Sequence, residues 1–267
     1  MGRQNQKMKT IYTGLIVLYS FIAGVASLFN GKARKWVKGR QGWREQIRSF
    51  SRGEGKVLWV HCASLGEFEQ GRPVIERIRK EQPGWKVVLT FFSPSGYEVR
   101  KDYSGADLVM YLPSDIPVNV SYFLDIISPD IVLIIKYEFW YNYLSELKRR
   151  KIPTYLVSGI FRPDQYFFRW YGRFARGVFP VFSSIFVQDE QSGRLLESIG
   201  YERYSVTGDT RFDRVSRIAE AARDLPAIER FCGNERLFVA GSSWDEDEDI
   251  IIRYINENPG SLKWVIA

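Results

Sequence analysis

The sequence is poor in the residues that build cysteine and histidine sites. Its 267 residues include two cysteines, Cys62 and Cys232, and one histidine, His61. The cysteines lie far apart and form no CxxC pair, so no disulfide framework is expected and a reducing compartment is the default. A single histidine disfavours a zinc site of the usual His/Cys type, and we expect no metal site.

Two nucleotide-binding motifs are also missing. The turn Ser64-Leu65-Gly66-Glu67 lacks the Gly-Lys-Ser/Thr ending of a P-loop. No GxGxxG follows an apolar run, which disfavours a dinucleotide-dependent dehydrogenase. Hydrophobic residues make up 45% of the chain, enough for a packed core, so global disorder is excluded.

Positive charge is concentrated at the N-terminus. The formal net charge is +7, yet apart from Glu45 the charged residues of segment 1–52 are all basic, and residues 53–267 are slightly acidic. A nucleic-acid-binding domain would spread basic residues over a folded face, so no nucleic-acid partner is expected. The basic excess instead suggests contact with anionic membrane lipids.

An uncharged stretch, Thr10–Asn30, interrupts this basic segment. At about 1.5 Å per residue, a helix of this length nearly spans a hydrocarbon core of about 30 Å. The positive-inside rule places the basic flank that follows it on the cytoplasmic side. We predict that residues 1–52 form a membrane anchor, spanning or deeply embedded, with a basic juxtamembrane segment. A cleaved signal peptide, with Gly24-Val25-Ala26 as a loose cleavage-like site, is the alternative.

From residue 53 onward, short apolar runs alternate with helical stretches. Continuous apolar strands alternating with helices indicate a parallel sheet covered on both faces, so we predict an α/β fold with a first Rossmann-like domain at 53–210. The expected strands are Val57–Ala63, Lys86–Phe92, Leu108–Leu112, Ile131–Ile135, Thr154–Val157, Ile185–Gln188 and Tyr204–Thr207, and the expected helices include Gly66–Glu81, Pro117–Ile127 and Glu138–Arg150.

The last part of the chain changes character. Residues 211–234 are polar and helical, with an interruption at Pro226, and read as an interdomain connector. Residues 235–267 then restart the strand–turn–helix pattern and are predicted to begin a second Rossmann-like domain that is incomplete in this sequence. A lone βαβ start cannot bury both faces of its sheet, so we expect this chain to be a fragment.

The stretch Val57–Glu69 carries the first candidate for chemistry. Its apolar strand breaks at a small turn that includes Ser64 and Gly66, and a helix begins near Glu67. Ligands of open α/β folds bind at the carboxyl ends of strands, and a carboxylate there can act as a general base. The alternative is that Glu67 only complements the helix dipole.

Glu138 follows the fourth expected strand and is a second acid on the same rim, with the same alternative. The aromatic residues around it fit an acceptor groove, a membrane contact or simple core packing; they are Tyr137, Phe139, Trp140, Tyr141 and Tyr143. Tyr166–Phe179 interleaves aromatic and basic residues, which suits an interfacial amphipathic helix or core packing. The turn Gly241-Ser242-Ser243 could bind an anionic donor, although the acidic run 245–249 would oppose it.

Taken together, these motifs resemble one family. The anchor, the basic stretch, HCASLGEFEQ, YEFWYN and VTGDTRFD occur in an order that resembles the Kdo transferases, the 3-deoxy-D-manno-octulosonic acid transferases of lipopolysaccharide synthesis. The resemblance implies two Rossmann-like domains of the GT-B glycosyltransferase type, on the cytoplasmic side of the inner membrane. It implies CMP-Kdo as donor and a lipid A precursor (lipid IVA) as acceptor, with no cofactor and no bound metal.

Residue roles follow from this resemblance by position. Glu67 matches the general base of an inverting transfer, and Ser64, Gly66 and Glu138 match acceptor-side positions. Arg211 matches a donor-binding position and lies in a glycine-x-x-basic-aromatic-aspartate motif that starts at Gly208. Gly241 and Ser242 match the first glycine-serine turn of the donor domain.

The sequence departs from the family at several positions. Lys136 stands where better-known members have an acid, and Ser158-Gly159-Ile160 replaces an asparagine-alanine-arginine segment. The later nucleotide-binding loops would fall beyond Ala267, so we expect the 267 residues alone to be inactive. A non-catalytic membrane-bound lipid-binding module, or a transferase of the same fold with another nucleotide sugar, are the alternatives.

Overall fold

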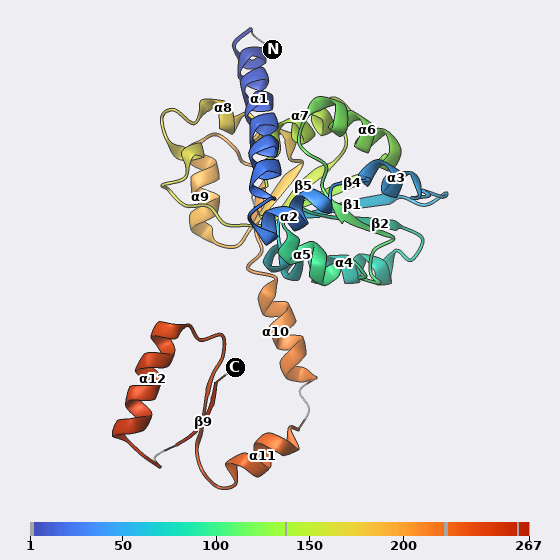
Figure 1. The fold of residues 1–267 in the computed structure, drawn as a ribbon. Helices are drawn as coiled ribbons and strands as arrows, with labels where there is room; N and C mark the ends of the chain where they lie inside the picture. Colours follow the sequence, from blue (N-terminus) through green and yellow to red (C-terminus); the bar gives the residue numbers. More distant parts are fainter. Residues whose placement is uncertain (1–2, 137, 222–223, 261, 267) are drawn as a thin grey trace. The chain divides into compact units, whose positions relative to one another are not determined.

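The computed structural model describes residues 3–136, 138–221, 224–260 and 262–266 (Figure 1). It separates into two compact units, Met1–Ser216 and Arg217–Ala267. Each unit has its own sheet and is described by itself below.

The first unit is built on a seven-stranded parallel sheet, as the sequence predicts. The strand order is β3-β2-β1-β4-β5-β6-β7, and every neighbouring pair is parallel. The ends differ from the prediction by one or two residues. The strands are β1 (Val57–Cys62), β2 (Lys86–Phe91), β3 (Leu108–Tyr111), β4 (Ile131–Ile135), β5 (Thr154–Gly159), β6 (Ser184–Val187) and β7 (Tyr204–Val206).

Both faces of this sheet are covered, because the side chains of the central strands alternate between two hydrophobic clusters. Leu58 and Val60 of β1 join the cluster under α4 (Leu65–Glu81) and α5 (Pro94–Arg100). Val57 and Trp59 join the cluster on the other face, with α3 (Trp43–Arg48), α6 (Pro117–Ile127) and α7 (Tyr141–Arg149). The α/β sandwich explains why these strands are apolar throughout rather than alternating.

The order of the strands fixes where a ligand site belongs. The chain runs outward from β1 through β2 to β3, and then returns to place β4 on the other side of β1. The connections from β1 therefore lead toward one edge of the sheet, and those from β4 lead toward the other edge. β1 and β4 are neighbours, and His61 pairs with Ile134 near their carboxyl ends. In open parallel sheets this switch point leaves a crevice at the carboxyl ends of the two strands, and ligands bind there.

Three helices precede the sheet: α1 (Arg3–Ala26), α2 (Gly31–Lys38) and α3. Over Gln6–Ala26, α1 is long and apolar enough to cross a membrane by length and composition. Figure 1 shows α1, in dark blue, running from α2 along the first unit, and Tyr12 of this helix donates a hydrogen bond to Asp115, 2.7 Å away.

Arg40, which is half-buried, attaches the α2 end of this segment to the sheet. Arg40 donates to the carbonyl oxygens of Phe92 and Leu112, which follow β2 and β3, at 2.9 and 3.0 Å. Its guanidinium also lies 3.8 Å from the ring centroid of Trp36. These contacts attach the basic segment to the carboxyl edge of the sheet.

The stretch Tyr166–Phe179 is not one amphipathic helix. It contains η1 (Tyr166–Phe168) and α8 (Arg173–Arg176) and reaches η2 (Phe179–Val181), while α9 (Glu190–Ser198) follows β6. Phe167 and Phe179 are buried in the core, whereas Trp170 is 90% exposed. Gly172 lies between η1 and α8, where the chain turns back tightly. A Cβ at this position would lie 2.0 Å from the carbonyl oxygen of Tyr166, so the turn requires glycine.

The C-terminal stretch contains α10 (Arg211–Glu220), which crosses the boundary between the units, and α11 (Pro226–Cys232). β8 (Leu237–Ala240), α12 (Asp245–Glu257) and β9 (Lys263–Ile266) follow. β8 and β9 pair in parallel, as a strand–helix–strand unit requires. Residues 235–266 thus have the local pattern expected for the start of a Rossmann-like domain.

Candidate functional site at the β1/β4 switch point

Glu67 lies at the carboxyl end of β1, in the first turn of α4. Ser64 precedes the helix, and its hydroxyl donates a hydrogen bond to Glu67 Oε2. The other carboxylate oxygen, Oε1, lies 3.8 Å from Nζ of Lys136, which follows β4. The Glu67 side chain keeps 17% of its surface exposed, so a substrate hydroxyl can reach it.

The position of Glu67 depends on a close approach of α4 to the sheet. A Cβ on Gly71, one turn further along α4, would lie 3.0 Å from Ile135 Cγ1 at the end of β4. A larger residue there would push the helix away from the switch point. Gly66 is under no such constraint, because the nearest atom to a Cβ there would be Ser64 Oγ at 3.8 Å.

Glu138 reaches the same rim from β4, but it is not in a helix. The predicted helix start at Glu138 is wrong: α7 begins at Tyr141, and Trp140 is extended because its indole packs against Phe92 with ring centroids 4.9 Å apart. The interpretation of Glu138 as a first-turn charge therefore fails. Tyr137, in the same motif, lies outside the described residues.

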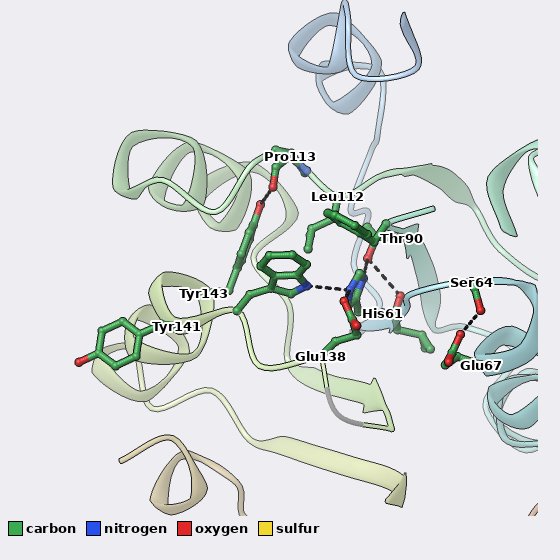
Figure 2. A network of polar contacts seen from close by, with 12 residues as sticks. His61, Ser64, Glu67, Thr90, Leu112, Pro113, Glu138, Tyr141 and Tyr143 are labelled. Atoms are coloured by element: carbon green, nitrogen blue, oxygen red, sulfur yellow. Dashed lines mark hydrogen bonds and ion pairs between the residues drawn. The ribbon is translucent and has the colours of Figure 1, made fainter. Parts of the chain in front are cut away.

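A buried histidine faces Glu138. His61 Nε2 lies 3.7 Å from Glu138 Oε2, and the indole N–H of Trp140 donates to the same nitrogen at 3.2 Å. Figure 2 shows His61 between Thr90 and Glu138, with Ser64 and Glu67 close by on β1's side of the rim. Among the described residues, Glu138 Oε2 is a buried oxygen without a hydrogen-bond partner.

The hydrogen bonds fix the tautomer of His61. Because Nε2 accepts from Trp140, the ring proton belongs on Nδ1, which then donates to Thr90 Oγ1 at 2.9 Å. The same hydroxyl accepts from Trp59 Nε1 at 2.8 Å, and it lies 3.5 Å from the carbonyl oxygen of Val60. A neutral, fixed imidazole thus supports the wall of the site on which Glu138 lies.

Lys136 turns the chain at the end of β4. Its φ is +63°, in the left-handed region that non-glycine residues rarely adopt. Such strained residues cluster at ligand sites, where the surrounding structure holds them. The result is that a lysine, rather than the acid known from better-studied relatives of the resembled family, faces Glu67.

Arg211 also belongs to this part of the first unit. Its guanidinium pairs with Asp209 at 2.5 Å, and Asp209 accepts from Gln70 Nε2 at 3.1 Å. Burial raises the pKa of Asp209, but the hydrogen bonds from Arg211 and Gln70 outweigh it and bring the pKa to about 2. Since Gln70 follows Glu67 by three residues on α4, Arg211 is tied to the helix that carries Glu67.

The other two predicted donor residues, Gly241 and Ser242, lie in the second unit. Ser242 has a φ of +58° in the turn between β8 and α12. Ser243 donates to Glu248 at 2.8 Å, and Asp247 accepts from the backbone N–H of Trp244. The acidic residues at the start of α12 therefore cap their own helix in part. The donor role of this turn stays a prediction.

Cysteine chemistry is disfavoured at the site. Cys62 ends β1 and is fully buried, and burial raises the pKa of its thiol well above the usual value, which suppresses the reactive thiolate. Among residues 3–136, 138–221, 224–260 and 262–266, no group of three or more His, Cys, Asp and Glu residues could hold a metal ion.

Sequence reasoning missed His61, Thr90 and Asp209 as parts of the site. From the sequence alone, His61 is considered only as a metal ligand. A usable signal was present, since Trp59 and His61 are two residues apart on one strand and must face the same side of the sheet. Their partner Thr90 lies on β2, paired in register with His61, and that register was not available from the sequence.

Solved structures identify the class of fold. The chain resembles solved UDP-N-acetylglucosamine 2-epimerases over most of its length. UDP-GlcNAc 2-epimerase from Neisseria meningitidis, bound to UDP-GlcNAc, matches with a TM-score of 0.55 and 19% identity, over 79% of this chain and 64% of that chain. A putative UDP-N-acetylglucosamine 2-epimerase from Listeria monocytogenes matches with a TM-score of 0.58 and 14% identity, over 79% and 62%. At these identities the likeness shows the GT-B type of fold alone.

The family is defined by the sequence. Residues 38–214 match the profile of the 3-deoxy-D-manno-octulosonic-acid transferase (kdotransferase) family, and the chain belongs to that family. The transferase of Chlamydia trachomatis serovar D is 27% identical over 227 residues, which are 82% of this chain and 53% of the relative. That of Haemophilus influenzae is 24% identical over 203 residues, 73% and 47%. The chain thus spans about half the length of these relatives.

Proposed function

We propose that this protein is the acceptor-side part of an inverting glycosyltransferase that moves Kdo from CMP-Kdo to a lipid A precursor in lipopolysaccharide synthesis. The observation that carries the proposal is the position of Glu67. A carboxylate at the β1/β4 switch point, reachable from solvent and held by Ser64, lies within the segment that matches the family. The anchor helix and basic segment suit an acceptor that is a membrane lipid.

In this mechanism Glu67 acts as the general base. It takes the proton from the attacking hydroxyl of the acceptor, and the hydroxyl oxygen forms the new bond to the anomeric carbon of Kdo. The bond from that carbon to the phosphate oxygen breaks on the opposite face, and CMP leaves with the electron pair. A single displacement of this kind inverts the anomeric configuration.

Glu138 and Ser64 are proposed to position the acceptor. Glu138 Oε2 is buried and lacks a hydrogen-bond partner among the described residues, so a sugar hydroxyl can donate to it. His61 of β1 lies beside this side chain, with its Nε2 3.7 Å from Glu138 Oε2, and the indole of Trp140 donates to the same nitrogen. Gly66 leaves the first turn of α4 without a side chain beside Ser64.

The donor contacts are proposed for Arg211, Gly241 and Ser242. Arg211 carries a positive charge that suits the phosphate of CMP-Kdo, and the Gly241-Ser242 turn precedes a helix N-terminus, which favours anions. These residues supply only part of a nucleotide site, so we expect residues 1–267 alone to bind acceptor without transferring Kdo.

The direct test is CMP release from CMP-Kdo in the presence of a tetraacylated lipid A precursor. The full gene product, including any residues that follow Ala267, is expressed in membranes beside E67Q and a control on the same helix, E81Q. Glu81 is 55% exposed and pairs with Arg77, one turn earlier on α4. We expect E67Q to lower the rate by roughly 10²–10⁴-fold, the usual contribution of general-base catalysis, and E81Q to leave it unchanged.

Two results would contradict this assignment. Release that survives in E67Q would return Glu67 to a helix-dipole role. A folded, lipid-binding protein that releases no CMP, with CMP-Kdo or another nucleotide sugar, would favour a non-catalytic lipid-binding module.

A further inference from the structure

The helix that could span the membrane is attached to the first unit along one of its sides. Five residues at helical spacing form this side, here called the inner stripe: Tyr12, Thr13, Ile16, Ser20 and Ala23. All five are half-buried. The packing of α1 against α2 and α7 accounts for this burial.

Polar contacts, not only apolar ones, hold the inner stripe. Tyr12 donates to Asp115 at 2.7 Å and accepts from the backbone N–H of Tyr141 at 3.3 Å. The Asn142 side chain donates to Thr13 at 3.2 Å, and the hydroxyls of Ser20 and Ser114 lie 3.5 Å apart. Asp115 itself is 2% exposed and also accepts from the first backbone N–H groups of α7.

These contacts lie in the middle of the apolar stretch. A spanning helix needs about 20 residues within a hydrocarbon core of about 30 Å, so nearly all of Gln6–Ala26 would have to enter it. The inner stripe would then carry Asp115, Asn142 and the start of α7 into the bilayer. Ionisable side chains at the depth of the hydrocarbon core are costly, and irregular backbone exposed to lipid does not occur there.

The opposite side of α1 is suited to lipid. Its outer stripe consists of large apolar side chains that are 47–68% exposed, namely Ile11, Leu15, Leu18, Phe21, Ile22 and Val25. A contiguous apolar surface of this kind marks an interaction site. No described element of the first unit covers it, and its residues recur at the spacing of one helical face.

Basic residues at both ends of α1 indicate how the helix is oriented at a membrane. Lys7 and Lys9 precede the apolar stretch, and Lys32, Arg34 and Lys35 follow it. Basic residues stay on the cytoplasmic side and are attracted by anionic headgroups. A helix that lies in the cytoplasmic membrane surface lets the basic residues at both of its ends contact anionic headgroups. A spanning helix would place the basic residues of one end on the other side of the membrane.

Exposed aromatic residues also lie in the segment next to α8. Tyr12 packs on Tyr141, which stacks on Phe174 of α8, so α8 and its neighbours lie beside the N-terminal half of α1. Just before α8, Trp170 and Tyr171 are 90% and 60% exposed. Tryptophan and tyrosine favour the headgroup level of a membrane.

We therefore propose that α1 does not span the bilayer but lies in its cytoplasmic surface, docked on the first unit, with the outer stripe inserted among the acyl chains of anionic phospholipids. This inference rests on the proposed membrane attachment and not on the transferase chemistry. In this arrangement the carboxyl edge of the sheet lies close to the lipid surface. Tyr19 of α1 stacks on Phe92, and the Phe92 ring contacts Trp140 of the site.

Labelling from the two sides of the membrane tests the topology. In a C232S background, which leaves only the fully buried Cys62, single cysteines are placed as Q6C before α1 and Q41C after α2, both at exposed positions. Inverted and right-side-out inner-membrane vesicles are treated with an impermeant maleimide. We expect both cysteines to react only in inverted vesicles. Reaction of Q6C in right-side-out vesicles, with Q41C protected there, would overturn the proposal.

A cross-link tests docking in the membrane-bound protein. The pair S20C/S114C replaces two hydroxyls 3.5 Å apart by thiols of similar size and should oxidise to a disulfide. The control pair L18C/S114C, with Leu18 on the outer stripe, should not. Failure of S20C/S114C to close in membranes, with closure in detergent, would show that α1 leaves the domain to enter the bilayer.

Vesicle binding tests the lipid-facing side. The full chain is mixed with vesicles of phosphatidylethanolamine and phosphatidylglycerol, and the bound fraction is measured by flotation. L15N and I22N should each lower binding at least about tenfold, because each removes a large inserted side chain. V118S on α6, which removes a comparably exposed side chain, should not change it. Equal binding by L15N, I22N and V118S would refute the lipid contact. None of the three readouts requires Kdo transfer, so their failure is distinguishable from failure of the transferase proposal.

Discussion

We predict that the hydroxyl of Thr90 stabilises the folded state by holding the buried side chains of Trp59 and His61, and that T90V removes this stabilisation. Thr90 is fully buried, and its oxygen is the partner of Trp59 Nε1 and His61 Nδ1, which are themselves only 1% exposed. Valine has nearly the shape of threonine, so the substitution removes the hydroxyl and leaves little cavity. Two buried N–H groups then lose their acceptor.

The cost follows from these two donors. A buried donor without a partner destabilises the folded state by roughly 1–3 kcal/mol, so T90V should lower the free energy of unfolding by about 4 kcal/mol. A change of tautomer, with the His61 proton on Nε2 instead of Nδ1, would not recover this free energy. The indole N–H of Trp140 donates to Nε2 and would then lose its own acceptor. The first unit comprises residues 1–216, and for a domain of this size 1 kcal/mol corresponds to roughly 2–4 °C in Tm.

The assay is thermal unfolding of the purified full chain in detergent, with T90S as the matched control. Serine keeps the hydroxyl and loses one methyl group, which costs about 1 kcal/mol and should lower Tm by roughly 2–4 °C. T90V should lower Tm by roughly 8–16 °C. Melting of T90V within about 2 °C of T90S would refute the hydrogen-bond network as the source of stability.

Two further substitutions probe the attachments of the N-terminal segment. Burial raises the pKa of Asp115 from 3.8 to about 6, so the folded state binds this proton more tightly and loses stability as the pH rises from about 4 through 6. The asparagine of D115N does not titrate, so the free energy of unfolding of D115N minus that of wild type should increase by about 3 kcal/mol as the pH rises from about 4 to 6. Denaturant unfolding at several pH values measures this difference. A difference that does not change with pH would contradict the raised pKa of Asp115. R40M should leave the carbonyl oxygens of Phe92 and Leu112 unpaired and expose the α2–α3 segment to trypsin. R40K, which keeps the charge but not the fork, should fall between R40M and wild type, and equal cleavage of all three would contradict the role of Arg40.

Local pattern was enough to predict the strands of the first sheet. Each strand of the first sheet is a short apolar run, and the observed ends lie within two residues of the predicted ones. At the start of α5, Ser93 accepts a hydrogen bond from the backbone N–H of Ser95, and Pro94 occupies the first turn, where proline is favoured. These features depend on neighbours along the chain, so the sequence carries them directly.

Prediction failed where distant residues compete with local preference. Glu138–Trp140 has a helical pattern, but Trp140 gains more from packing on Phe92 and bonding to His61 than from joining α7. The aromatic run beside it packs in part into the core, as Tyr143 does against Trp59, while Trp140 lies at the site. Both outcomes depend on which strands are neighbours.

The sequence by itself determined the alternation of strands and helices, the apolar helix with its basic flanks, and the presence of Glu67 and Glu138 after two strands. Only the tertiary structure decided that β1 and β4 are adjacent, which brings these acids to one crevice. It also decided that Thr90 supports His61 and that α1 docks through Tyr12 on Asp115. The physical reason is that strand order, register and helix docking arise from contacts between residues far apart in the chain, and a local pattern does not specify which of these contacts form.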